Sequence, residues 1–199
     1  MENLVAYAVA YLIGGIPFGL IFAYAFGAGD IRQQGSGSIG ATNVLRVLKE
    51  RDPKLAKKVA VLTFLGDFGK AVVPICVARF LGLDDATLWA MAVLAVVGHC
   101  FSPYLGFNGG KGIATGVGAI MAILPIEAWL GLLVWFIFAK GLKISSVASL
   151  AGAFTAVVSS FFIHPQLPSH LPLLLILFFI VYKHIPNIKR LLSGQEGRV

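Results

Sequence analysis

Three short polar segments interrupt an otherwise apolar sequence, and their residue types are those of a phosphate-binding site. The segments are Gly35–Arg46 (GSGSIGATNVLR), His99–Thr115 (HCFSPYLGFNGGKGIAT) and His184–Leu192 (HIPNIKRLL). Glycine lets neighbouring backbone N–H groups turn toward one point, while Ser, Lys and Arg add hydroxyl and cationic donors. If the three segments share one membrane face, they can converge on a single pocket for an anionic ligand.

The first segment supplies a loop rich in glycine and serine, followed by an arginine. Its candidate substrate- or phosphate-binding residues are Ser36, Gly37, Ser38, Gly40, Thr42 and Asn43. Such a loop can form an anion nest, and Arg46 adds a planar fork that matches phosphate oxygens. A flexible loop beside an Arg that extends to the interface is the alternative, so this segment alone leaves phosphate binding open. Thr42 or Asn43 also suits the N-cap of a short amphipathic helix.

In the second segment, a lysine stands among glycines directly before an apolar run. Gly109, Gly110 and Gly112 flank Lys111, and N–H groups at a helix N-terminus attract anions. The sequence does not fit a nucleotide-hydrolysing P-loop, because Leu105 stands where that motif needs Gly and Gly112 stands where it needs Ser or Thr. Backbone capture of phosphate stays open. We expect His99, at the end of the preceding apolar run, to support the loop.

Two further sets of polar residues suit catalysis or its support. His184 and Asn187 are three residues apart, so a continuing helix would put them on one face, although Pro186 disfavours a regular helix. A neutral His can accept a proton, and Asn can orient a hydroxyl. Asp67 and Lys70 lie inside an apolar run, either as a structural ion pair, which we favour, or as a source of positive potential for a buried pocket.

Composition places the chain in a membrane. Of its 199 residues, 58% are hydrophobic and 13% are charged, and the mean hydropathy is +0.87, whereas soluble domains carry about 25% charge. The net charge of +7 lies mainly between apolar runs, which is typical of cytoplasmic loops and argues against a nucleic-acid partner. Cys76 and Cys100 have no metal or redox spacing. Because no carboxylates cluster in the inner loops, we expect no metal and no other cofactor.

The hydropathy pattern predicts an all-α, polytopic membrane helix bundle with about seven transmembrane helices. The predicted spans are Leu4–Phe26, Leu55–Leu81, Ala86–Phe107, Ile113–Leu124, Ile126–Ala139, Ile144–Ile163 and Leu171–Tyr182. The fourth, fifth and seventh are short for a full crossing. With the N-terminus outside and the C-terminus cytoplasmic, nearly all basic residues fall on the inner side, as the positive-inside rule requires. They are Arg32, Arg46, Lys49, Arg51, Lys54, Lys57, Lys58, Lys111, Lys140, Lys143, Lys183, Lys189, Arg190 and Arg198.

The alternative is that Pro125 kinks one long helix rather than ending a span. Merging the fourth and fifth spans would leave six crossings, which would put Lys140 and Lys143 outside together with the basic C-terminal tail. The charge bias therefore favours seven spans. Asp52 and Pro53 are typical of an N-cap and first helical residue, and so predict the start of the second span.

Taken together, the three segments resemble the small integral-membrane acyl-phosphate:glycerol-3-phosphate acyltransferases of bacteria. That family shows GSGNxGATNxxR, HxFxxFxGGKGxAT-type and HxxNIxRL segments, and this chain has all three in the same order over nearly its whole length. It departs from the pattern at three positions. Ser38 replaces the usual Asn, Tyr104 replaces a common Phe, and Asn108 stands where a basic residue is frequent.

The resemblance implies a single integral-membrane acyltransferase domain over residues 1–199, in the bacterial inner membrane, with its active site facing the cytoplasm. The implied reaction is acyl transfer from acyl-phosphate to the sn-1 hydroxyl of glycerol-3-phosphate, giving lysophosphatidic acid and phosphate, the first acylation of phospholipid synthesis. It also implies contact with membrane lipids and, as the one protein partner to consider, the enzyme that supplies acyl-phosphate. The expected catalytic residues are His184, Asn187, Lys111 and Arg46, with His99, Asp67 and Lys70 in support.

Other acyl- or phosphoryl-transfer chemistries fit less well. None of the four histidines is followed five residues later by Asp, so the His-x4-Asp pair of soluble-type glycerolipid acyltransferases is missing. A CDP-alcohol phosphotransferase would need several Asp residues spaced along helices for metal. The main rival is a transporter or channel for an organic phosphate, which would also use many spans and anion-binding segments. Against it, the polar segments gather at one interface, with little polar sequence in the outer half.

Overall fold

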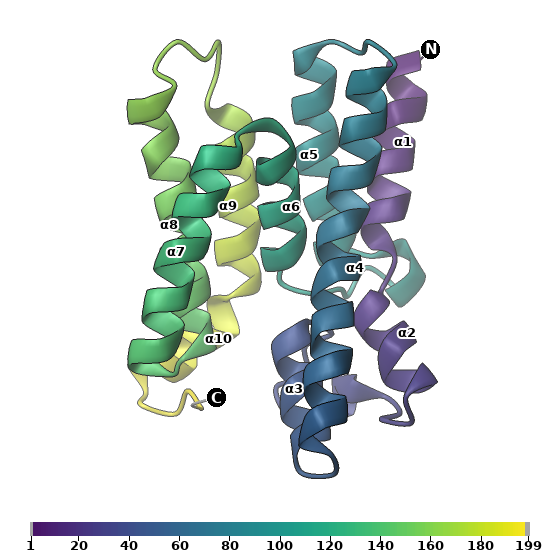
Figure 1. Ribbon diagram of the computed structural model, residues 1–199, viewed down its shortest axis with the longest axis vertical. Coiled ribbons are helices and arrows are strands. Elements are labelled where there is room, and N and C mark those ends of the chain that lie inside the picture. The colour runs from purple at the N-terminus through teal and green to yellow at the C-terminus, as the bar shows by residue number, and fades with distance from the viewer. Residues whose placement is uncertain (1, 198–199) are drawn as a thin grey trace.

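The computed structural model describes residues 2–197 as a bundle of helices, and that part of the chain contains no β-strand, which confirms the all-α prediction (Figure 1). The helices are α1 (Glu2–Gly15), α2 (Phe18–Ala25), α3 (Ala41–Lys49), α4 (Pro53–Phe80), α5 (Asp85–Cys100), α6 (Ile113–Ile123), α7 (Pro125–Leu142), α8 (Ser145–Ile163), α9 (Leu171–Lys183) and α10 (Ile185–Leu192), with 3-10 turns η1 (Ile31–Gln33) and η2 (Pro103–Leu105). Arg198, which the sequence analysis assigned to the inner side, lies outside the described residues.

Helix length supports a multi-pass membrane protein. Within residues 2–197, five segments are long and apolar enough to cross a bilayer: Asn3–Ala25, Pro53–Phe80, Asp85–Leu105, Pro125–Leu142 and Ser145–Ile163. The pair α9 and α10 adds a sixth if it is counted as one span, although it bends by 56°. The predicted fourth span is the short helix α6, which has 11 residues. Seven apolar segments are therefore present, and the predicted count of seven crossings stays a prediction.

The predicted fourth and fifth spans are separate helices rather than one kinked helix. α6 ends at Ile123, and Pro125 is the first residue of α7, where its fixed φ and missing N–H suit a helix start. The two helices pack side by side, and the chain reverses direction between them (Figure 1). Pro125 therefore marks a turn, as the charge distribution required.

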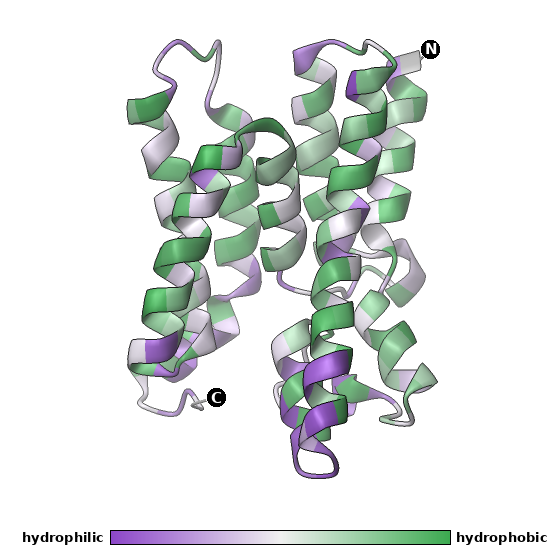
Figure 2. Cartoon of the chain, viewed as in Figure 1, coloured by the Kyte–Doolittle hydropathy of each residue, from purple (hydrophilic) through white to green (hydrophobic). Residues whose placement is uncertain are grey.

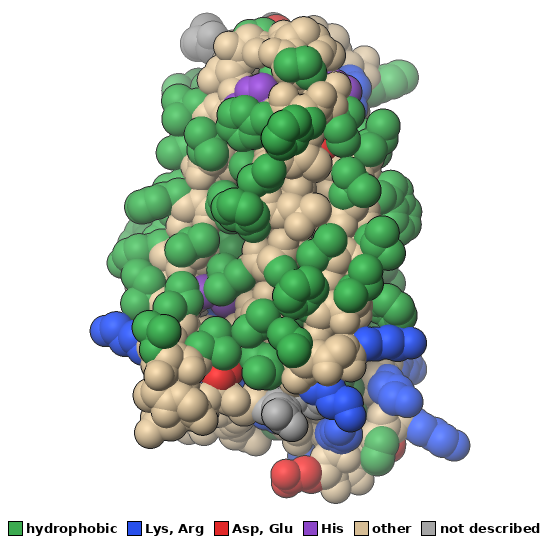
Figure 3. All heavy atoms as spheres, turned by 90° about the vertical axis from the view of Figure 1, so that its left-hand side faces the viewer, with side chains coloured by type: hydrophobic (Ala, Val, Ile, Leu, Met, Phe, Trp, Pro, Cys, Tyr) green, Lys and Arg blue, Asp and Glu red, His purple; other side chains and the backbone are tan. Residues whose placement is uncertain are grey.

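Charged and apolar residues separate along the bundle axis. Hydrophobic residues dominate the helices through most of their length, and hydrophilic residues gather at the end that carries α3, α10 and the C-terminal segment (Figure 2). On the face seen in Figure 3, most Lys and Arg side chains lie at this end, below a wide hydrophobic band. The two chain ends lie at opposite ends of the bundle (Figure 1).

Local chemistry explains several helix boundaries. Asp52 accepts hydrogen bonds from the backbone N–H groups of Lys54 and Leu55 and so caps α4 as predicted. The first span is interrupted between α1 and α2, where Pro17 stands and donates no backbone hydrogen bond. The predicted amphipathic helix is α3, but its N-cap is Gly40, so the suggestion that Thr42 or Asn43 caps it was wrong. Both of those side chains make other contacts, described below.

Two apolar clusters position the site. The larger one joins α1 and the helices from α4 to α9. The smaller one lies under α2, α3 and the start of α4, where Ile31, Val44 and Leu48 are almost fully buried. This second cluster fixes the 26–40 loop and α3 on the N-terminal end of α4. The first polar segment is therefore anchored by burial and not by its own sequence alone.

Candidate active site

A cavity of about 780 Å³ opens where the three polar segments meet. Its volume lies within the usual range of about 300–1,000 Å³ for small-molecule sites. The predicted site residues that line it are Ser36, Ser38, Gly40, Thr42, Asn43, Arg46, Asp67, His99, Lys111, Gly112, His184 and Asn187. Gly37 and Gly109 line a smaller neighbouring cavity of about 410 Å³, which shares Ser36, Lys111 and Asn187. Gly110 and Lys70 line neither cavity, and both lie against His99, which does line the larger one. Segments that are distant in sequence thus converge as predicted.

Asn43 organises the first polar segment. Its side-chain oxygen accepts hydrogen bonds from the N–H and the hydroxyl of Ser36, and its side-chain nitrogen donates to the carbonyls of Ile31, Gln34 and Ser38. Asn43 is 1% exposed. Its polar capacity is therefore used within the loop, which suits a residue that shapes the site rather than one that holds substrate directly.

The glycine–serine loop does not present a full anion nest. The N–H of Ser36 is bonded to Asn43, that of Gly37 to the carbonyl of Gln34, and that of Gly40 to the hydroxyl of Ser38. Because these N–H groups bond within the loop, the donors left to the cavity are mainly side chains. Thr42 and Ser145 of α8 bring their hydroxyl oxygens within 3.2 Å of each other, which links α3 to the opposite wall of the cavity.

In the second segment, the glycines are required by the close approach of His99. Gly110 donates its N–H to the carbonyl of His99 at 3.0 Å, and a Cβ on Gly110 would collide with Nε2 of the His99 ring. A Cβ on Gly109 would collide with the His99 carbonyl. Gly112 has a φ of 83° and is the N-cap of α6, a conformation that L side chains rarely adopt. The loop therefore packs tightly on the end of α5 and delivers Lys111 to the cavity.

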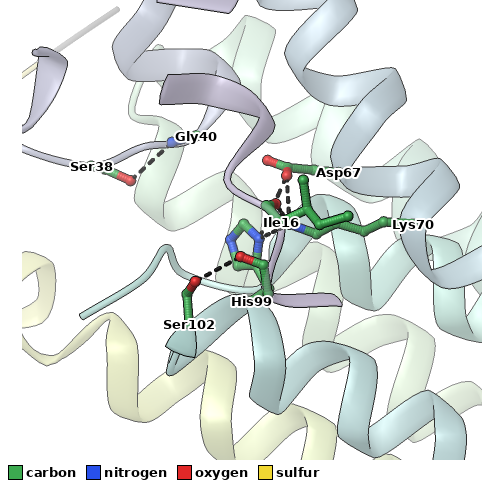
Figure 4. Close-up of polar contacts among 8 residues, drawn as sticks. Ile16, Ser38, Gly40, Asp67, Lys70, His99 and Ser102 are labelled. Carbon is green, nitrogen blue, oxygen red and sulfur yellow. Dashed lines mark hydrogen bonds and ion pairs between the residues drawn. The ribbon is translucent and has the colours of Figure 1, made fainter. Parts of the chain in front are cut away.

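Behind this loop, a buried network joins Asp67, Lys70 and His99 (Figure 4). The Lys70 ammonium lies 2.7 Å from a carboxylate oxygen of Asp67, 2.8 Å from the carbonyl of Ile16 and 2.8 Å from Nδ1 of His99. An ammonium has three N–H donors and no acceptor, so His99 must accept at Nδ1 and is neutral, with its proton on Nε2. The network ties the α1–α2 break, α4 and α5 to the Gly109–Gly112 loop, and this supports the structural reading of the ion pair.

Lys111 is a half-buried cation close to the charges of Glu196, Arg190 and Arg46. Burial lowers the pKa of its ammonium from 10.5 to about 8; Glu196 opposes that change, and Arg190 and Arg46 reinforce it. Burial disfavours a charge that has lost its water, and neighbouring positive charges disfavour it further. The end of the cavity that carries these residues therefore has an excess of positive charge, which is the environment that an anionic ligand would neutralise.

The third segment bends the chain at His184. α9 ends at Lys183, α10 begins at Ile185 with Pro186 in its first turn, and the two helices meet at 56°. Nδ1 of His184 lies 2.7 Å from the carbonyl of Ile180. Because a carbonyl only accepts, Nδ1 carries the proton, and Nε2 keeps a lone pair. His184 and Asn187 are both almost fully buried and line the cavity.

Glu196 is a site residue that the sequence analysis missed. Its carboxylate accepts hydrogen bonds from Asn187 at 2.6 Å, Ser146 at 2.8 Å and Arg190 at 2.7 Å. Burial raises the pKa of Glu196, but these hydrogen bonds outweigh burial and hold the pKa below its usual value. Within the described residues, the side-chain oxygen of Asn187 is buried and has no hydrogen-bond partner. Glu196 thus fixes the Asn187 amide with its oxygen left for a ligand donor.

We call Glu196 and its three donors, Asn187, Ser146 and Arg190, the Glu196 clamp. The sequence analysis did not predict Arg190 or Ser146 as site residues. Arg190 was expected to serve membrane topology, and the structure places it on the cavity wall, paired with Glu196. Ser146 was not singled out, although it follows Ser145 at the start of α8. The only sequence signal for the clamp is Glu196 itself, the sole acidic residue after Glu127 in the chain.

The fold and the cavity together define a polytopic membrane protein with a cationic site that opens into an apolar interior. The chain belongs to the glycerol-3-phosphate acyltransferase family, whose family model matches residues 4–194. It is 58% identical to the glycerol-3-phosphate acyltransferase of Campylobacter concisus over the full length of both chains. It is 55% identical to that of Nitratiruptor sp., with 99% of this chain and 96% of the relative covered.

Solved structures of a family member share the same architecture. A crystal structure of PlsY (YgiH), an integral membrane glycerol 3-phosphate acyltransferase, in its glycerol 3-phosphate form matches with a TM-score of 0.89 at 34% identity, covering 100% of this chain and 96% of that chain. The lysophosphatidic acid form of PlsY matches with a TM-score of 0.86 at 35% identity, covering 100% and 95%. The predicted family and enzyme class are thereby confirmed.

Proposed function

We propose that this protein transfers a fatty acyl group from acyl-phosphate to the sn-1 hydroxyl of glycerol-3-phosphate, giving lysophosphatidic acid and inorganic phosphate. In this reaction the hydroxyl oxygen attacks the acyl carbonyl carbon, and the bond from that carbon to the bridging phosphate oxygen breaks. Phosphate leaves with the electron pair. No covalent acyl-enzyme is needed, because the donor is already activated.

One observation carries the proposal: a single cavity is cationic where the three polar segments meet and apolar along α4, α6, α7 and α8. Both substrates carry phosphate, and one also carries a fatty chain, so this division matches their chemistry. The titles of the two PlsY structures add support, because they name the acceptor substrate and the acylated product as ligands of a relative with the same fold.

The proposed residue roles follow from the geometry. Lys111 and Arg46 neutralise phosphate, with the hydroxyl of Ser38 as a neutral donor beside them, while Ser36 is held in the loop by its hydrogen bonds to Asn43. Thr42, Asn43 and the glycines Gly37, Gly40, Gly109, Gly110 and Gly112 shape the loops that hold these donors. Positioning supplies most of the rate: good orientation contributes about 7–11 kcal/mol in model reactions, and each preorganised donor to a developing oxyanion about 3–4 kcal/mol.

Two groups compete to accept the proton of the glycerol hydroxyl. Nε2 of His184 has a free lone pair by the hydrogen-bond argument above, and a phosphate oxygen of the substrate is the alternative. His184→Gln separates them, because a general base contributes about 10²–10⁴-fold. A fall in kcat of a hundredfold or more assigns the proton to His184, and a fall below tenfold assigns it to phosphate. Asn187 orients the hydroxyl through its unpartnered oxygen.

We place the protein in the bacterial inner membrane as one integral-membrane acyltransferase domain, with the cavity mouth toward the cytoplasm. The basic residues gather at the end of the bundle that carries the mouth, and positive charge is retained on the cytoplasmic side. Cytoplasmic access to glycerol-3-phosphate, and to an enzyme that supplies acyl-phosphate, follows from this orientation.

The decisive experiment uses purified full-length protein in lipid nanodiscs with acyl-phosphate and glycerol-3-phosphate. We expect phosphate release and lysophosphatidic acid formation in equal amounts, and loss of both when glycerol-3-phosphate is omitted. Lys111→Ala and Arg46→Ala should each lower kcat/KM at least about tenfold, the loss of 1.4 kcal/mol of transition-state stabilisation. The same protein in sealed vesicles tests the alternative function, a transporter or channel for an organic phosphate. Flux of glycerol-3-phosphate across the bilayer without acyl transfer would show that the protein is a transporter and not an acyltransferase.

A further inference from the structure

One arginine lies at the end of the bundle opposite to the basic loops. Arg79 is an exposed residue in the last turn of α4, the helix that runs from α3 toward the other end of the bundle (Figure 1). All but two of the 16 Lys and Arg residues were assigned to the inner side, and the other exception, Lys70, belongs to the buried network behind the cavity. The positive-inside rule does not account for Arg79, so we expect a structural role.

Arg79 supplies a hydrogen-bond donor that the end of α6 lacks. α6 ends at Ile123 and α7 begins at Pro125, so the helical ladder of N–H groups stops before the last carbonyls of α6 are paired. Ala122 is buried, and Nη1 of Arg79 donates to its carbonyl. A guanidinium at a helix C-terminus satisfies such a carbonyl and is favoured by the helix dipole. Arg79 thus caps α6 from a neighbouring helix.

The same two helices touch backbone to backbone in the middle of α6. A Cβ on Gly118 would collide with the carbonyl of Phe68 on α4. From that contact α4 rises about 16 Å to Arg79, whereas α6 rises only about 6 Å to Ala122. The long Arg79 side chain, which leaves its helix tilted toward the N-terminus, reaches back to the end of the shorter helix. Gly118 therefore sets how close α6 lies to α4, and Arg79 ties α6 at one height along it.

The other end of α6 carries the lysine of the proposed phosphate site. Lys111 and Gly112 stand directly before Ile113, the first residue of α6. The 11 residues of α6 rise about 16 Å and move as one stiff unit, so a shift of the far end along α4 also shifts Lys111. Neither Arg79 nor Ala122 lines either cavity. Their contact can therefore affect the site only through α6.

We propose that Arg79 is a positioning residue, which pins the C-terminal end of α6 to α4 and thereby sets how deep Lys111 enters the cavity. This inference deepens the proposed function and rests on it, because it takes Lys111 as the phosphate-binding cation. Without the guanidinium, the buried Ala122 carbonyl loses its donor, and α6 is free to move along α4. A more mobile α6 lets water reach Lys111 and blurs the placement of its ammonium against phosphate.

The test compares Arg79→Met with Arg79→Lys in the full-length protein in lipid nanodiscs, with acyl-phosphate and glycerol-3-phosphate as substrates. Arg79→Met keeps an unbranched side chain but removes the donor and the charge. Because a misplacement of about 1 Å can cost about a hundredfold in rate, we expect kcat/KM for glycerol-3-phosphate to fall about 10- to 100-fold. Arg79→Lys keeps a cationic donor for the carbonyl and should stay within about threefold of the unmodified protein.

The pH profile separates positioning from a general loss of stability. Lys111 faces Glu196, Arg190 and Arg46, and its charge also acts on His184; the variants change none of these groups. Burial lowers the pKa of Lys111 to about 8, so kcat/KM should fall above that pH as the ammonium loses its proton. Better access of water raises the pKa of a buried lysine, so this alkaline limit should rise by about half a pH unit or more in Arg79→Met. In Arg79→Lys the limit should stay where it is.

The matched control is Lys54→Met, which removes an exposed cation from the first turn of the same helix and should change neither kcat/KM nor the alkaline limit. Gly118→Ala displaces α6 by a second route, since its Cβ meets the Phe68 carbonyl, and it should raise the limit in the same way. It decides the question if Arg79→Met does not fold.

Three results would overturn the assignment of Arg79. They are normal kinetics in Arg79→Met with only a lower melting temperature, an equal loss of kcat/KM in Arg79→Lys, and an unchanged alkaline limit in Gly118→Ala. A failure of the proposed function is distinct, because the unmodified protein would then transfer no acyl group from acyl-phosphate to glycerol-3-phosphate.

Discussion

The depressed pKa of Lys111 predicts an alkaline limit to activity that belongs to one side chain. Burial brings the pKa of this ammonium from 10.5 to about 8 in the unliganded protein, so Lys111 is charged below that pH and loses its charge above it. Glycerol-3-phosphate has its second phosphate pKa near 6, so the substrate is already a dianion in this range. Between about pH 7.5 and 9.5, the charged fraction of Lys111 falls about 25-fold, and kcat/KM should fall by the same factor, since it reports ionisations of the free enzyme.

Lys111→Arg isolates the responsible group, because a guanidinium stays charged throughout this range. We expect its kcat/KM, whatever its absolute value, to be flat between about pH 7.5 and 9.5. Initial rates are measured by phosphate release, corrected for spontaneous hydrolysis in enzyme-free samples at each pH. The limit should move to higher pH in kcat, because a bound dianion favours the ammonium. A flat profile in the unmodified protein, or the same alkaline fall in Lys111→Arg, would refute the assignment of Lys111 to the anion site.

Three further predictions concern the supporting contacts. Glu196→Gln replaces one acceptor oxygen with an NH2 group that faces the donors of Asn187, Ser146 and Arg190. Because a hydrogen bond to a charged group contributes about 1.5–3 kcal/mol, kcat/KM should fall at least about tenfold. Unchanged steady-state kinetics would exclude the clamp. Lys70→Met leaves Asp67 charged and buried and should destabilise the protein by about 3–5 kcal/mol. The double variant Asp67→Asn with Lys70→Met should recover part of this loss, measured by thermal unfolding in detergent. Equal melting temperatures for the single and double variants would contradict the pairing. Gly110→Ala forces a Cβ onto His99 and should raise KM for glycerol-3-phosphate about tenfold or more. The control is Gly69→Ala on α4, whose added Cβ has nothing within 4 Å, and its KM should stay unchanged. Similar KM values in the two variants would argue against loop displacement.

Much of the fold could be predicted because apolar runs and basic loops obey simple rules. The separation of α6 from α7 at Pro125 followed from charge alone, since a merged helix would have put Lys140 and Lys143 on the outer side. The number of full crossings could not be predicted in the same way. α6 is apolar enough for a span but has only 11 residues, and its short length matters through its neighbours α4 and α7, which hydropathy does not report.

The site was predicted where function and local motif coincide, as for Lys111 and Asn187. It was missed where a residue acts through tertiary contacts. Glu196 follows the last motif in what reads as a polar tail, and its importance depends on the tail folding back onto α10 and α8. Asn43 shows the opposite case: the motif marked it as a ligand residue, but its hydrogen bonds all hold the loop.

The start of α6 determines where the second polar segment lies. Because it begins at Ile113 inside the bundle, the Gly109–Gly112 loop must enter the bundle, and it can do so only by packing on His99, which Lys70 and Asp67 hold from behind. The same geometry partly buries Lys111, which lowers its pKa and limits water around it. Limited water would protect the proposed acyl-phosphate donor from hydrolysis, and it strengthens the attraction between Lys111 and phosphate. The point at which α6 begins therefore also sets the electrostatics of the phosphate site.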